Sequence, residues 1–169
     1  PFKVFTFNHL LTQLQFVCVG SAEAVAKWTA VTSITVKNVT TELKLSLDKT
    51  TGAGLTATGA TDKSLPVKSC PATVSVVGQA TPRTGYLMLY PVVDMGTVAA
   101  AIDLEVKATY GGEVKTLPVS ITNIDGGVQA GQSHLITLTF AEDGTIIAEA
   151  GIAVWQPGND GSSIITPGE

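Results

Sequence analysis

The stretch GQSHLITLTFAEDGTIIAEAGIAVW, residues Gly131–Trp155, decides the fold that this sequence predicts. Two runs within it, 135–140 and 145–155, alternate apolar residues with polar or small ones, and Glu142-Asp143-Gly144 joins them. Strict alternation is typical of strands, and an Asp-Gly turn between two such runs predicts a β-hairpin. One face of this hairpin should belong to a core. In its second arm the residues that share one face are Ile146, Ala148, Ala150, Ile152 and Val154.

A second hairpin is predicted by the residues before this stretch. From Ile102 to Tyr110 apolar residues alternate with charged residues and Thr, Gly111-Gly112 supplies a two-residue turn, and Glu113–Ile121 returns. Because the alternation has no break, this run predicts its buried and exposed faces without ambiguity.

The first part of the chain also reads as strands. Lys3–Phe7 alternates, with Phe5 and Phe7 on one side, and the apolar run Leu11–Val19 follows. Ser21–Trp28 has helical propensity with Ser21 as N-cap, so it predicts a short helical connector.

Further along we expect a hairpin between Val31–Val36 and Glu42–Leu47, with leucines facing inward at 43, 45 and 47. Residues 50–64 are rich in Gly, Thr and Ala, which favours a surface loop with room for a short edge strand. Thr73–Val77 and Tyr86–Tyr90 complete the predicted set.

The composition favours a single all-β domain. The chain has 169 residues, of which 44% are hydrophobic and 14% charged, and β-branched residues fill most apolar runs. Turn signals every 8 to 12 residues and about 7–10 short strands are typical of a two-sheet antiparallel β-sandwich with Greek-key connections and little helix.

Charge and hydropathy exclude several classes of function. The formal net charge is −4 and the ten Lys and Arg residues are scattered, so no basic face for nucleic acid is predicted. No apolar run approaches the roughly 18 residues of a transmembrane helix. The chain begins at Pro1 without a signal peptide, so we expect a processed form or a fragment. Cys18 and Cys70 could form a disulfide or could be two buried thiols.

No catalytic pattern is evident. The possible bases for a nucleophile are His9 and His134, both in or beside predicted strands, where a structural histidine is the usual interpretation. Asp103 and Glu105 point outward from a strand, as a solvated face would. Asn123 with Asp125, or residues 159–161, could contribute to a calcium site, but turn formation explains them equally well. We therefore expect no enzyme, cofactor or metal.

Two stretches together resemble Bacteroidales fimbrillins, the family of type V pilins and Mfa-like fimbrial proteins. The opening FKVFTFNHLLTQLQFVCV, residues 2–19, is similar to a strand with a His that runs into an apolar strand in that family. The closing GQSHLITLTFAEDGTIIAEAGIAVWQPGNDG, residues 131–161, is similar to its terminal hairpin, which ends in Trp and a Gly-Asp-rich tail. Together they bracket one family domain, the C-terminal one.

The resemblance implies a transthyretin-like sandwich spanning residues 1–169, from an exported protein of the outer membrane and fimbrium that is made as a lipoprotein precursor. It implies a structural or accessory subunit that binds other fimbrial subunits by strand addition and serves cell adhesion to a host or bacterial surface protein or glycan. The candidate exchange strand is Ser162, Ser163, Ile164, Ile165 and Thr166, and a frayed terminus is the alternative. The alternative function is a surface carbohydrate-binding module that uses Trp28 and Tyr86.

Overall fold

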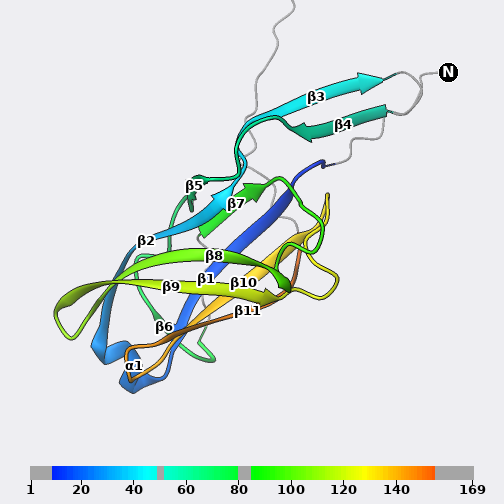
Figure 1. The fold of residues 1–169 in the computed structure, drawn as a ribbon. Coiled ribbons are helices and arrows are strands. Elements are labelled where there is room, and N and C mark those ends of the chain that lie inside the picture. The colour runs from blue at the N-terminus through cyan, green and yellow to red at the C-terminus, as the bar shows by residue number, and fades with distance from the viewer. Residues whose placement is uncertain (1–8, 49–51, 80–84, 155–169) are drawn as a thin grey trace, which may run out of the picture.

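The chain is described by a computed structural model that covers residues 9–48, 52–79 and 85–154. It is all-β apart from one short helix, and two packed sheets form a β-sandwich (Figure 1). The elements are β1 (Thr12–Gly20), α1 (Ala22–Lys27), β2 (Trp28–Val39), β3 (Leu43–Asp48), β4 (Gly52–Ala57), β5 (Lys63–Pro66), β6 (Ser75–Val76), β7 (Gly85–Leu89), β8 (Thr97–Tyr110), β9 (Glu113–Asn123), β10 (Ser133–Phe140) and β11 (Ile146–Ala153).

The first sheet, sheet A, is built around β1. Its order is β11-β10-β1, and the other side of β1 is shared by β7 and β6. The β10–β11 pair is the antiparallel hairpin predicted from Gly131–Trp155. By contrast, β1 runs parallel to β10 and β6 and antiparallel to β7. Sheet A is therefore a mixed sheet and not a purely antiparallel one.

The second sheet, sheet B, is antiparallel throughout, in the order β5-β2-β8-β9. The β8–β9 hairpin confirms the prediction for residues 102–121. Gly111 and Gly112 have φ values of 60° and 87°, the left-handed backbone that a two-residue hairpin turn requires and that glycine adopts without strain.

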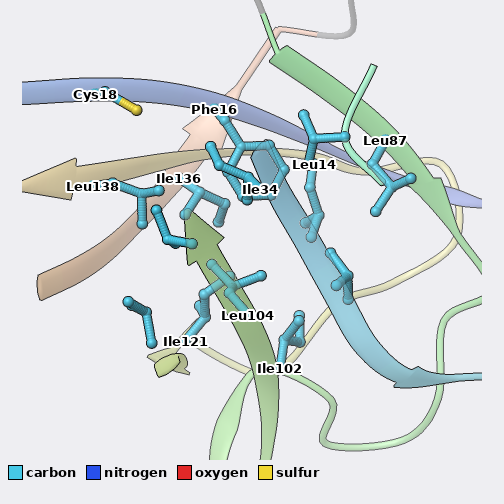
Figure 2. Packing of buried hydrophobic residues seen from close by; sticks show 14 of the residues in the cluster. Leu14, Phe16, Cys18, Ile34, Leu87, Ile102, Leu104, Ile121, Ile136 and Leu138 are labelled. Carbon is cyan, nitrogen blue, oxygen red and sulfur yellow. The ribbon is translucent and has the colours of Figure 1, made fainter. Parts of the chain in front are cut away.

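The core lies between the two sheets and is filled by alternate residues of their strands (Figure 2). Every second residue of β8 from Ile102 to Ala108 is buried, as its alternation predicts. Sheet A contributes the inward-facing residues of β1, β7 and β10. The side chains labelled in Figure 2 are Leu14, Phe16, Cys18, Ile34, Leu87, Ile102, Leu104, Ile121, Ile136 and Leu138.

Helix α1 is the predicted connector between the sheets. The Ser21 side chain accepts a hydrogen bond from the Ala24 amide at 3.1 Å, which confirms Ser21 as the N-cap. The helix leads directly into β2, so it carries the chain from sheet A to sheet B.

The predicted hairpin between Val31–Val36 and Glu42–Leu47 is wrong. Both runs are strands, but the first belongs to β2, which pairs with β8 and β5, and β3 pairs with β4 instead. Residues 50–64, predicted as a surface loop with room for a short edge strand, contain β4 and the start of β5. Alternation identifies a strand but not the strand with which it pairs. The sequence did not reveal β4 as the partner of β3, because small residues make up most of β4.

Two predicted burial patterns also need correction. The leucines of β3 do not face the core, because Leu45 is 54% exposed and Leu47 is 79% exposed. In β11 the core-packed face includes Ile146, Ala148 and Ala150, whereas Ile152, on the same side of the strand, is 88% exposed. The sandwich therefore covers only the first part of β11.

Truncation of Phe16 should destabilise the fold severely. Its ring is fully buried between the sheets, so Phe16→Ala should lower the free energy of unfolding by about 3–5 kcal/mol through lost burial and the cavity left behind. Urea unfolding measures this change. Ile147→Ala, at an exposed position, should change it by only about 0.5 kcal/mol. A loss below about 1 kcal/mol for Phe16→Ala would contradict the proposed core.

Candidate interaction surfaces

A buried network of uncharged polar side chains lies where the described chain leaves β11. The Gln15 side-chain nitrogen carries two hydrogens and lies within hydrogen-bonding distance of three acceptors, the Val154 carbonyl at 2.8 Å, Ser133 Oγ at 2.8 Å and Gln13 Oε1 at 3.0 Å. Ser133 Oγ also donates to Gln13 Oε1 at 2.9 Å. These bonds fix Val154 beside the central strand β1, so the chain that follows it starts from an anchored point.

The network occupies the face of β1 that points away from the core. Leu14 and Phe16 point into the core, so Gln13 and Gln15 belong to the opposite face, yet Gln15 is only 1% exposed. Gln15 Oε1 has no hydrogen-bond partner among the described residues, and an unpaired buried carbonyl is costly. The outer side of sheet A at Gln15 thus holds a buried acceptor that lacks a donor in the part of the chain that the structure describes.

The outer face of sheet A carries exposed apolar side chains beside this network. Tyr86 and Met88 of β7 lie opposite Gln15 and Gln13 in the register and are both exposed. Ile147 is exposed on the same face of β11. Apolar side chains around a polar centre are the kind of surface that a protein partner can cover.

Trp28 is a core residue, so its ring is unavailable as a surface platform for a sugar. It is 1% exposed, and its Nε1 donates to the Ala141 carbonyl at 2.8 Å. Its ring lies 4.7 Å from that of Tyr110 and 5.0 Å from that of Phe140. Trp28 and Tyr110 belong to sheet B and Phe140 to sheet A, so this cluster joins the sheets. Of the two predicted ligand-contact aromatics, only Tyr86 lies at the surface, at 48% exposure.

The two histidines are not brought together with a nucleophile. His9 is exposed, whereas His134 is buried on the inner side of β10, opposite Leu14 of β1. Burial lowers the pKa of His134, and its Nε2 has no hydrogen-bond partner in the described part of the chain. His134 is therefore a neutral core residue at physiological pH.

The cysteines and the surface carboxylates have structural explanations too. Cys18 and Cys70 are free thiols, and burial raises the pKa of both. Asp103 accepts from Ser120 at 3.0 Å and from Asn38 at 3.4 Å on the outer face of sheet B. Ordinary cross-strand pairing on a solvated face explains this carboxylate.

Several predicted positions lie outside the described residues. They are the candidate exchange strand Ser162, Ser163, Ile164, Ile165 and Thr166, and residues 159–161 of the possible calcium site. Within the described ranges, no group of three or more His, Cys, Asp or Glu side chains could hold a metal ion. The same ranges contain no helix with the length and hydrophobicity needed to cross a membrane.

The β-sandwich and its sequence define the class of protein. Residues 3–155 match the sequence model of the fimbrillin-like family. Because this match covers most of the chain, the chain belongs to the fimbrillin-like family. A search of curated proteins found no match.

A solved structure shares the fold. A candidate cell adhesion protein from Bacteroides uniformis superposes with a TM-score of 0.58 at 16% identity, over 90% of this chain and 53% of its own. Another from Bacteroides ovatus has a TM-score of 0.49 at 15% identity, over 90% of this chain and 47% of its own. The chain thus spans about half the length of these proteins.

The buried His134 should make stability depend on pH. Its pKa is lower in the folded protein than in the unfolded chain, so below about pH 6.5 the unfolded state binds the proton first. The free energy of unfolding should therefore fall as pH drops through this value, by at most about 1.4 kcal/mol per pH unit. Urea unfolding between pH 7.5 and 5.5 measures the slope. His134→Gln should flatten it, and an equal slope in both proteins would refute this assignment.

Proposed function

We propose that this chain is a structural or accessory subunit of a bacterial surface fimbria that serves cell adhesion. Membership of the fimbrillin-like family is the observation that carries the proposal. The family resemblance and the greater length of the structural neighbours support a further point, that residues 1–169 form the C-terminal domain of an exported protein of the outer membrane. Its partners would be other fimbrial subunits.

Assembly by strand complementation is the mechanism we propose. An added strand uses main-chain hydrogen bonds for affinity and alternate side chains for specificity. The segment Ser162–Thr166, SSIIT, offers two β-branched apolar residues in the tail that follows Trp155. The anchored Val154 supports this role, because its hydrogen bond to Gln15 places the residue before Trp155 at a defined point on sheet A.

Removal of residues 156–169 should abolish polymer formation and leave the sandwich folded. Gels run without boiling should show detergent-resistant ladders from sheared fimbriae of wild-type cells and none from cells with the truncated protein. Ile164→Asp with Ile165→Asp should have the same effect, because charges cannot occupy apolar pockets. Ser162→Ala with Ser163→Ala is the matched control.

Two results separate the parts of the proposal. A normal ladder from the truncated protein would refute the role of the tail but not the fimbrial function. Absence of the wild-type chain from the fimbrial fraction would refute the fimbrial function itself. Circular dichroism of each purified variant shows whether the sandwich is intact.

The second candidate function, a carbohydrate-binding module, rests on Tyr86 alone. Its half-exposed ring lies on the outer face of sheet A, near the exposed side chain of Met88 and the buried amide network. Such a ring can stack on a sugar. On a glycan array, Tyr86→Ala should lose binding that the wild type shows, whereas Tyr90→Phe should keep it. An array without any wild-type binding would exclude this function for the glycans tested.

A further inference from the structure

The β3–β4 hairpin, called the ribbon below, is amphipathic. The register pairs Leu43 with Ala57 and Leu45 with Leu55, so odd-numbered residues of both strands share one face. The opposite face carries Lys44, Ser46 and Thr56. The face called the apolar face consists of Leu43, Leu45, Leu47, Ala53, Leu55 and Ala57.

This apolar face is exposed, and the ribbon pairs with no other described strand. The ribbon projects beyond the two sheets (Figure 1), and β3 and β4 pair only with each other within the described residues. Leu45 and Leu47 are largely exposed. An isolated two-stranded hairpin is marginally stable in water, and a third strand or a packed apolar face is normally needed. The ribbon therefore lacks a layer.

The outer edge of β4 pairs with no other described strand. The Thr58 amide donates to the Glu42 carbonyl at 2.9 Å, which makes that pair a hydrogen-bonded one. In an antiparallel ladder such pairs alternate with non-hydrogen-bonded pairs, so Leu55 directs its amide and carbonyl outward. The Tyr90 hydroxyl indeed donates to the Leu55 carbonyl, at 3.4 Å.

The same contact places this edge next to the start of β1. Tyr90 directly follows Leu89, and Leu89 lies opposite Thr12 in the β1–β7 register. The start of β1 is thus separated from the middle of β4 by the side chain of Tyr90. Residues 1–8 can span roughly 26 Å when extended at about 3.3 Å per residue, and a strand of six residues such as β4 spans roughly 20 Å.

We propose that residues 1–8 form the missing layer of the ribbon, lying along β4 with Phe5 and Phe7 on its apolar face. The sequence FKVFTF alternates as a strand does, with Phe5 and Phe7 on one side. Because this segment is tethered at Thr12, its effective concentration at the ribbon exceeds that of a second copy of the chain.

The test is amide hydrogen exchange of residues 43–57 in the full chain and in a Phe5→Ser, Phe7→Ser variant. Loss of the phenylalanines should speed exchange of the ribbon amides by about tenfold or more, because the ribbon then opens as an isolated hairpin. Amides of β1 and β10 should be unchanged. The matched control is Val4→Ser with Thr6→Ala, on the other side of the segment, which should change ribbon exchange far less.

Two results would overturn the proposal. Ribbon exchange that is the same in the wild type and the Phe5, Phe7 variant would show that this segment does not cover it. Protection that instead rises with protein concentration would assign the apolar face to a second copy.

A second measurement does not depend on a variant that folds. Nuclear Overhauser effects between the rings of Phe5 and Phe7 and the methyl groups of Leu45, Leu47 and Leu55 are expected in the unaltered chain. Their absence from a well-resolved spectrum would overturn the proposal as well.

Discussion

The structure depends on the burial of β1 from both sides. Its inner residues, such as Leu14 and Phe16, fill the core, and outer residues such as Gln15 and Val17 are buried as well. Strands buried on both faces are normally continuous apolar runs in parallel sheets. Here amide side chains occupy part of the hidden outer face, and they are tolerated because they bond to Ser133 and Val154. The same strand pairs with β10, β7 and β6, so it aligns all of sheet A.

Local periodicity predicted the strands better than it predicted their partners. Ile102–Tyr110 and the closing hairpin could be recognised because short turns force neighbouring strands to pair. In the parallel β1–β10 pair, Gln13 lies opposite Ser133, although most of the sequence separates these two residues. No local signal in the sequence encodes such a contact. The leucines of β3 show the same limit, since alternation reveals an apolar face but not whether the body of the protein covers it.

The candidate surfaces were harder to predict than the fold, for a related reason. A tryptophan in a sequence can be a sugar platform or a core residue, and only the approach of the Ala141 carbonyl and of Phe140 decides the matter for Trp28. Gln15 gave no signal either, because a polar residue that alternates with apolar ones normally faces water. Its role arises from Ser133 and Val154, which are distant in sequence and adjacent only in the folded sheet.

The anchoring of Val154 has a mechanical consequence. The start of β1 and the end of β11 lie at the same end of sheet A, because Gln13 pairs with Ser133 and Ser133 with Ala153. A pulling force applied between these two points would load the β1, β10 and β11 ladders at one end, so their hydrogen bonds would break one after another rather than together. The first contacts to bear tension would be those of Gln15. Resistance to stretching would therefore be set by a few buried amides, while the hydrophobic core sets thermal stability.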